Sequence, residues 1–229
     1  MSLTLHQHPD KTTLDQALVA FVSEQLQTAI DQRDKASLVV SGGSTPTDFF
    51  QQLSQQPLNW SKVIITLADE RCVPATDDRS NAKMVQDLLL QNQARAARFI
   101  PMFVTDESIE DCRQRLQRVF ANNPFDVVIL GMGGDGHTAS IFPEAAERDQ
   151  ALDLANDSLV LTTDPVTVTP DRITFTRKAL LNSRQLLLHF TGDSKWQIFE
   201  QAQAKPQGQF PISYFIHQDN LPLQVFFSP

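Results

Sequence analysis

The feature that most constrains this chain is a glycine-rich segment, Gly131–Gly136, which directly follows a short apolar run, Val127–Leu130. Four of the chain's eight glycines fall within these six residues, with Asp135 among them and His137 next to them. Glycine permits positive φ and lets a ligand approach the backbone closely. In open α/β sheets, ligands bind outside the carboxyl ends of the parallel strands. The segment therefore predicts an active site at the end of a buried strand.

Apolar or β-branched runs alternate with stretches of helical periodicity along most of the chain. This alternation predicts an α/β fold with a doubly wound, mostly parallel sheet (Rossmann-like), flanked by helices and with smaller peripheral strands in the C-terminal half. No repeat or biased linker divides the sequence, so we expect residues 1–229 to form a single α/β domain. The expected helices cover 12–31, a segment after Pro46, 81–95, 107–121 and 194–204, and the expected strands cover 37–40, 63–67, 127–130, 159–163, 172–176, 186–190 and 223–227.

Composition excludes several classes of partner. The net charge of −8 argues against nucleic acid, because phosphate backbones need clustered Lys and Arg. No apolar run approaches the roughly 18 residues of a membrane span. The N-terminal segment Met1–Lys11, with His6 and His8, lacks a secretory h-region and is interpreted as a solvated tail. Cys72 and Cys112 match no metal-ligand spacing and no disulfide framework, so we expect free thiols in a reducing cytoplasm.

The segment Ser41–Pro46 has the composition of a phosphate-binding loop. Gly42 and Gly43 free backbone amides, Ser44 and Thr45 add hydroxyls, and a helix N-terminus follows. It is not a Walker A loop, because the Gly-Lys-Ser/Thr ending is missing. A plain glycine turn with a Ser or Thr cap is the alternative, and the strand before it favours phosphate.

A second strand end carries three adjacent charges, Asp69–Arg71. We favour Arg71 as a contact for an anionic substrate oxygen or phosphate, and Asp69 as a positioning group. A solvated charge cluster is the alternative, and Ser80 is expected only to cap the next helix. The carboxyl ends of parallel strands lie along one edge of a sheet, so we expect all three loops to meet in one crevice.

The glycine loop formally satisfies the dinucleotide motif G-x-G-x-x-G. A regular helix should then open at once to support pyrophosphate, whereas Pro143 interrupts the segment and Asp135 brings negative charge. We therefore disfavour a dinucleotide site. We expect Gly134 instead to let a substrate approach the backbone.

His137 suits the role of general base, because an imidazole accepts a proton near neutral pH. Either Asp135 or Asp69 could fix its tautomer. His189, within an apolar run, is interpreted as a structural histidine. A metal held by Asp135 and His137 would lack further ligands, so no metal site is predicted.

Two later cations could contact an anion. Arg172 lies in a predicted strand, and Lys195 lies in the first turn of a predicted helix, where the dipole disfavours a cation. An exposed lysine is the alternative for Lys195. Which of Arg71, Arg172 and Lys195 contacts phosphate stays open.

Together these segments resemble the 6-phosphogluconolactonases, within the larger family that also holds glucosamine-6-phosphate isomerase/deaminase. They occur in family order and span nearly the whole chain, and the glycine–histidine segment is the specific one. The matching segments are Ser41–Pro46, Asp69–Pro74 with Ser80–Asn81, Gly131–Pro143, Arg172–Thr176 and Gly192–Lys195.

The resemblance implies hydrolysis of 6-phospho-D-glucono-1,5-lactone to 6-phosphogluconate, the second step of the oxidative pentose phosphate route. It implies no metal or organic cofactor. We expect a small phosphorylated sugar lactone as ligand, no nucleic-acid or membrane partner, and a cytoplasmic monomer or weak dimer. By analogy, His137 activates water beside Asp135 and Asp69. The loop with Ser44 and Thr45, with Arg71 and Lys195, would hold phosphate or ring oxygens.

The deaminase relatives provide a contrast. They tend to have Asp-Glu-Tyr where this chain has Asp69–Arg71, and a glutamate where it has Phe142. Both differences favour the lactonase and leave the isomerase or deaminase second. A dinucleotide oxidoreductase and a catalytically silent sugar-phosphate sensor are the remaining alternatives.

Overall fold

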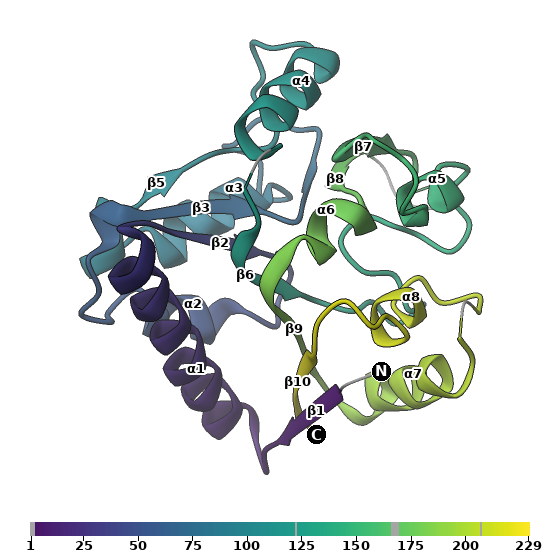
Figure 1. The fold of residues 1–229 in the computed structure, drawn as a ribbon, viewed down its shortest axis with the longest axis horizontal. Coiled ribbons are helices and arrows are strands. Elements are labelled where there is room, and N and C mark those ends of the chain that lie inside the picture. The colour runs from purple at the N-terminus through teal and green to yellow at the C-terminus, as the bar shows by residue number, and fades with distance from the viewer. Residues whose placement is uncertain (1–2, 122, 166–169, 207) are drawn as a thin grey trace.

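The computed structural model describes residues 3–121, 123–165, 170–206 and 208–229. Its main layer is a seven-stranded, entirely parallel sheet with the order β1-β10-β9-β6-β2-β3-β5, and a smaller antiparallel sheet has the order β4-β8-β7 (Figure 1). The doubly wound parallel sheet predicted from sequence is confirmed. The strands are β1 (Leu3–Gln7), β2 (Ala36–Val40), β3 (Val63–Leu67), β4 (Asp69–Arg71), β5 (Arg98–Phe99), β6 (Phe125–Leu130), β7 (Val160–Thr163), β8 (Arg172–Phe175), β9 (Ser183–Thr191) and β10 (Leu223–Ser228).

Helices pack against this sheet through apolar faces. The α-helices are α1 (Lys11–Arg33), α2 (Thr47–Leu53), α3 (Asn81–Met84), α4 (Ile109–Phe120), α5 (Arg148–Leu152), α6 (Arg177–Leu181), α7 (Asp193–Ala204) and α8 (Ser213–Ile216). In Figure 1, α1 and α2 lie together on one side of the sheet, away from α7 and α8. No helix in the described part of the chain is both long and apolar enough to cross a bilayer.

The longest helix, α1, shows how local sequence defines an element. It begins after Asp10, whose carboxylate accepts a hydrogen bond from the Thr13 amide, as a good N-cap residue does. It ends at Asp34, whose left-handed conformation (φ 59°) lets its amide donate to the Ile30 carbonyl. Residues at helical spacing, Leu14, Leu18, Val22 and Leu26, are fully buried against the sheet.

The central strand β6 is buried on both faces, as expected of a parallel strand covered by helices. Its residue Val128 lies opposite Val39 of β2 and Leu186 of β9. The strand therefore delivers the glycine-rich segment to the middle of the sheet's carboxyl edge, between the loops that follow β2 and β9.

Three details differ from the sequence predictions. The expected solvated tail is wrong, since residues 3–7 form β1 and pair with β10 (residues 1–2 lie outside the described part). The expected helix at 81–95 breaks into α3, a π-helical turn at Val85–Leu89 and a 3₁₀ turn at Asn92–Ala96, which begins with a positive φ of 47° at Asn92. The charged segment expected as a loop, Asp69–Arg71, is strand β4, which pairs antiparallel with β8.

Candidate active site

A cavity of about 230 Å³ opens at the carboxyl edge of the parallel sheet. Its wall joins the loops after β2 and β6, strand β4, the end of β9 and the first turn of α7, so the three predicted loops do meet in one crevice. The predicted site residues that line it are Gly42, Gly43, Ser44, Thr45, Asp69, Arg71, His137 and Lys195.

The glycine loop is built around the imidazole of His137. The Gly133 amide donates to the His137 carbonyl (2.9 Å) and the Gly136 amide donates to the Gly133 carbonyl (3.0 Å). A Cβ added at Gly133 would lie 2.2 Å from His137 Cε1, and Gly136 has φ 76° with Phe210 close to its α-carbon. Two glycines are therefore required, one by close approach and one by conformation.

Asp135 orients His137. Its Oδ1 lies 2.5 Å from His137 Nδ1 and also accepts a hydrogen bond from the His137 amide (3.1 Å). Burial raises the pKa of Asp135, but the hydrogen bond and the charge of His137 outweigh it, so the net pKa is lowered from its ordinary value. An ionised Asp135 holds the proton on Nδ1 and leaves Nε2 unprotonated. In the described part of the chain Nε2 has no hydrogen-bond partner, and it is the ring nitrogen that can accept a proton from water.

Phe142 contacts the same imidazole, with ring centroids 4.7 Å apart. No helix follows the glycine loop until α5 begins at Arg148, among the residues that the structure describes. The loop therefore lacks the helix that supports pyrophosphate in a dinucleotide site.

Asp69 lies across the cavity wall from the glycine loop and is nearly buried. Its Oδ2 accepts a hydrogen bond from Ser140 Oγ (2.5 Å), and its carbonyl accepts one from Asn81 Nδ2 (2.9 Å). Ser140 belongs to the glycine–histidine segment, so this contact ties β4 to the loop that carries His137. Asp135, and not Asp69, is the carboxylate in contact with His137.

Glu70 points away from the cavity and organises the start of α3. Its buried carboxylate accepts hydrogen bonds from the amides of Arg71, Asn81 and Ala82 and from the Ser80 hydroxyl. Burial raises the pKa of Glu70, and these hydrogen bonds only partly offset it. The expected N-cap is confirmed, since Ser80 Oγ accepts from the Lys83 amide (3.2 Å).

Arg71 extends into the cavity wall from the end of β4. Its Nη1 donates to the Arg79 carbonyl, and its Nε is buried with no hydrogen-bond partner. No acidic side chain pairs with its guanidinium in the described residues. An unneutralised guanidinium in a cavity wall is suited to an anionic ligand.

The loop after β2 has the open backbone that an anion requires. Gly43 has φ 98°, and none of the amides of Gly43, Ser44 and Thr45 donates a hydrogen bond within the described residues. Gly42 lies against Asn81, where a Cβ would approach Oδ1 to 1.9 Å. Free amides directed from a glycine turn form an anion-binding concavity.

Lys195 completes the set of cavity cations. It is half-buried in the first turn of α7, and burial lowers its pKa. It has no acidic partner in the part of the chain that the structure describes. Its charge is therefore available to a ligand, as its unfavourable place at a helix N-terminus suggested.

Three predicted residues do not line the cavity. Asp135 lies behind His137 and acts through it. Gly134 borders open space, with nothing within 4 Å of an added Cβ. Arg172 is buried in β8 opposite Arg71, and its Nη1 donates to the Pro170 carbonyl. Burial, and then the charge of Arg71, lower the pKa of Arg172.

Two polar residues of the cavity wall were missed by sequence analysis. Asn81 was given no role in the site, yet it lines the cavity and contacts both Gly42 and Asp69. His189 is buried, as expected of a structural histidine, but it also forms part of the cavity wall. For His189, the signal available in the sequence was a polar residue near the carboxyl end of an otherwise apolar strand. Within the described residues, no three His, Cys, Asp or Glu side chains gather as a metal site.

A family model and individual related sequences point to the same group of proteins. A family model described as glucosamine-6-phosphate isomerases/6-phosphogluconolactonase matches residues 9–223. A 6-phosphogluconolactonase of Mesorhizobium japonicum is 42% identical over 96% of this chain and 93% of its own length. One of Rhizobium meliloti is 40% identical over the full length of both chains.

Solved structures show the same relationship. The crystal structure of a 6-phosphogluconolactonase from Shewanella baltica matches with a TM-score of 0.94 and 42% identity, over 99% of this chain and 98% of that one. A monomeric glucosamine-6-phosphate deaminase matches with a TM-score of 0.78 at 17% identity, over 99% of this chain and 97% of its own. At that identity the match shows a common fold, and the fold alone does not distinguish the two activities.

Proposed function

The chain belongs to the glucosamine-6-phosphate isomerase/6-phosphogluconolactonase family, and within it we propose that this protein hydrolyses 6-phospho-D-glucono-1,5-lactone to 6-phospho-D-gluconate. The observation that carries the proposal is His137, held by Asp135 through Nδ1 in the wall of a small cavity that also contains unpaired cations. Relatives that match this chain over nearly their whole length are named 6-phosphogluconolactonase.

The reaction begins with a water molecule between His137 and the lactone carbonyl. The water oxygen bonds to C1 while His137 Nε2 accepts a water proton, and Asp135 stabilises the resulting imidazolium. Arg71 or a loop amide stabilises the oxyanion of the tetrahedral intermediate. The C1–O5 bond then breaks, and His137 returns its proton to the departing ring oxygen. The new carboxylic acid ionises, so one proton appears in solution for each turnover.

The 6-phosphate is assigned to the opposite part of the cavity. Ser44 and Thr45 offer amides and hydroxyls, and Lys195 offers a charge without an acidic partner. Arg71 lines the same cavity and is available to either end of the substrate. Hydrolysis of this lactone would place the protein in the oxidative branch of the pentose phosphate pathway.

Deamination or isomerisation of an amino-sugar phosphate is the competing function. By the family resemblance, it needs a glutamate where this chain has Phe142, to support ring opening. Here the imidazole of His137 contacts an aromatic ring at that position. The carboxylates near this base are Asp135, which holds His137, and Asp69, which binds Ser140. With an aromatic ring in place of the glutamate, such a site fits water attack better than ring opening.

The test follows base uptake at constant pH while the purified protein acts on freshly made 6-phosphogluconolactone. We expect the wild type to exceed the spontaneous rate, and His137→Ala to fall to that rate while its affinity for 6-phosphogluconate is largely kept. His8→Ala, which changes a histidine outside the cavity wall, is the matched control. Ammonia release from glucosamine 6-phosphate, with no acceleration of lactone opening, would overturn the proposal in favour of the deaminase.

A further inference from the structure

A pair of buried ionisable groups, Asp15 and His189, lies beside the cavity. Asp15 of α1 and His189 of β9 are almost completely buried (0% and 4% exposed). His189 Nε2 lies 3.4 Å from Asp15 Oδ1, and neither atom makes a hydrogen bond of good geometry. His189 nevertheless belongs to the cavity wall. A ligand in the cavity can therefore be sensed by a group that the hydrolytic mechanism does not use.

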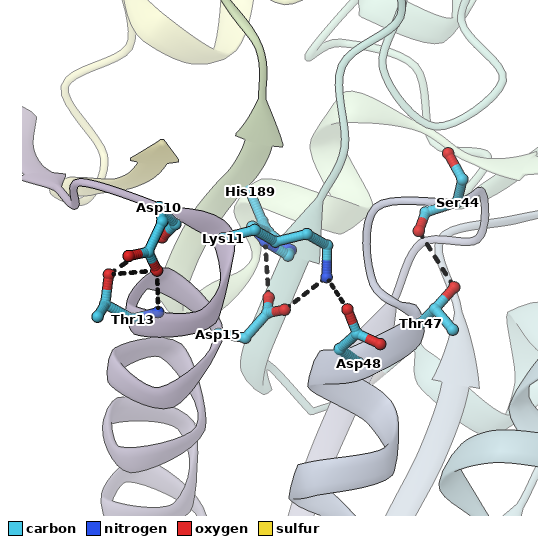
Figure 2. Close-up of polar contacts among 8 residues, drawn as sticks. All are labelled: Asp10, Lys11, Thr13, Asp15, Ser44, Thr47, Asp48 and His189. Carbon is cyan, nitrogen blue, oxygen red and sulfur yellow. Dashed lines mark hydrogen bonds and ion pairs between the residues drawn. The ribbon is translucent and has the colours of Figure 1, made fainter. Parts of the chain in front are cut away.

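The pair is connected to a second carboxylate through one lysine, as Figure 2 shows. Lys11 Nζ donates to Asp15 Oδ2 (2.6 Å) and to Asp48 Oδ2 (2.7 Å), which joins the start of α1 to the start of α2. In the same view, Thr47 Oγ1 donates to the Ser44 carbonyl (3.1 Å), next to Asp48. The network therefore reaches the loop to which we assign the 6-phosphate.

Packing alone does not account for this pair. Burying a carboxylate and an imidazole costs free energy that a pair of apolar residues of similar volume would avoid. Apolar neighbours also surround the imidazole, since the ring of Phe49 lies 6.0 Å from it and the residue opposite His189 in β10 is Phe226. Perturbed ionisable groups in the wall of a binding cavity are candidates for a functional role.

We propose that His189 is a proton-linked phosphate contact, which takes up a proton when a phosphate dianion binds at the Ser44–Thr45 and Lys195 end of the cavity. This inference rests on the proposed function, because it concerns the 6-phosphate of the same substrate. Asp15 acts as a positioning residue that keeps Nε2 directed away from the cavity, so that Nδ1 is the nitrogen available to the ligand.

Burial is the main factor that favours the neutral form of His189 in the free protein. Burial lowers the pKa of His189, Asp15 partly offsets this effect, and Lys11 and Lys195 lower the pKa further. Burial raises the pKa of Asp15, but contacts with His189 and Lys11 outweigh it, so Asp15 stays ionised. The facing charges are thus Asp15 and Lys11 from α1, Asp48 from α2 through Lys11, and Lys195 from α7, while β10 contributes Phe226.

A bound dianion changes this balance. It offsets the charge of Lys195 and favours the imidazolium, so the pKa of His189 rises on binding. Between the pKa of the free protein and that of the complex, binding takes up as much as about one proton, and affinity rises by up to about tenfold for each unit that the pH falls. Above the pKa of the complex, this gain is absent.

The experiment measures proton uptake by titration calorimetry at pH 7, in two buffers of different ionisation enthalpy. The probe is D-glucitol 6-phosphate, which has the phosphate but no carboxylate, and D-glucitol is the matched ligand without phosphate. We expect uptake with the wild type and with His137→Asn, and loss of uptake with His189→Asn. His8→Asn is the control for removing a histidine outside the cavity, and Asp15→Asn should reduce the uptake.

The outcomes separate this inference from the proposed function. Binding and turnover without uptake, or equal uptake by His189→Asn, would overturn the role of His189 and leave the lactonase intact. Neither binding nor turnover by the wild type would overturn both. If His189→Asn does not fold, nuclear magnetic resonance of the imidazole signals in His137→Asn decides the matter. The probe must then shift a buried imidazole toward its protonated form, and no shift refutes the inference.

Discussion

Gly133→Ala tests whether the glycine loop serves to place the imidazole. The added Cβ would lie 2.2 Å from His137 Cε1, 2.3 Å from its Nδ1 and 2.8 Å from Asp135 Oδ1. Ordinary contact begins near 3.4 Å, so the ring must withdraw by about 1.2 Å. That movement breaks the contact between Asp135 and His137, which is only 2.5 Å long.

The expected loss of activity follows from this displacement. A misplacement of about 1 Å can cost about 10²-fold in rate, and complete loss of a general base costs at most about 10⁴-fold. We therefore expect kcat for 6-phosphogluconolactone to fall by about 10²- to 10⁴-fold, with a smaller change in KM. The assay is base uptake at constant pH, corrected for spontaneous opening.

Gly134→Ala is the matched control, because its Cβ meets nothing within 4 Å and its φ is not positive. It should stay within a few-fold of the wild type. Both variants should unfold at similar urea concentrations, since the affected atoms lie at the cavity. A Gly133→Ala enzyme with wild-type kcat would refute the argument that close packing against this glycine places the base.

Three further predictions address the surroundings of the site. Glu70→Ala should lower the free energy of unfolding by about 2–4 kcal/mol in urea titrations, because the three amides and one hydroxyl that Glu70 accepts from lose a buried charged acceptor; a change below 0.5 kcal/mol would contradict this. Lys195→Met should raise KM for the phosphorylated lactone by about 10- to 100-fold, as expected for the loss of one hydrogen bond to a charged group. Hydrolysis of unphosphorylated gluconolactone should stay nearly unchanged. Equal losses on both substrates would exclude a phosphate role for Lys195. Burial, and then the charge of Asp171, raise the pKa of the Cys72 thiol from 9.0 to about 11. At pH 8, iodoacetamide should therefore alkylate Cys72 about 100-fold more slowly in the folded than in the unfolded protein. Mass spectrometry measures the labelling, and rapid labelling of the folded protein would count against this prediction.

Sequence patterns predicted the features whose causes are local. The run of apolar residues ending at Leu130 predicted a central strand, and the glycines after it predicted the loop that carries His137. The places of the Ser41–Pro46 loop and of Lys195 in the cavity wall were equally accessible, because each segment follows directly from a strand and precedes or begins a helix. The carboxyl edge of a parallel sheet then brought these separate segments together, which required only the strand assignments.

The features that sequence analysis missed depend on pairing between distant segments. Asp69–Arg71 becomes a strand only because it pairs with β8. Leu3–Gln7 becomes a strand only because it pairs with β10, the last strand of the chain. Arg172 carried the right chemistry, but the register of β8 buries it beside Arg71 and outside the cavity wall. His189 appeared structural because its partner, Asp15, is far away in the sequence and no local spacing relates the two.

Because the deaminase shares this fold, the choice of reaction must depend on side chains, and Phe142 is a candidate because its ring contacts His137. Phe142→Glu would place a carboxylate where the aromatic ring now lies, 4.7 Å from the imidazole centroid. A nearby negative charge favours the imidazolium over the neutral imidazole. The base would then stay protonated, and unable to accept a proton, up to a higher pH.

We therefore expect the acid limb of the profile of kcat/KM for the lactone to move to higher pH by about 1 pH unit in Phe142→Glu, with activity recovering at alkaline pH. Phe142→Gln, which has the same shape without the charge, should keep the acid limb of the wild type and separate the electrostatic effect from lost packing. If both variants lose activity equally at all pH values, the ring of Phe142 acts by holding His137 in place. The absence of a carboxylate at this position would then have no bearing on which reaction the protein catalyses.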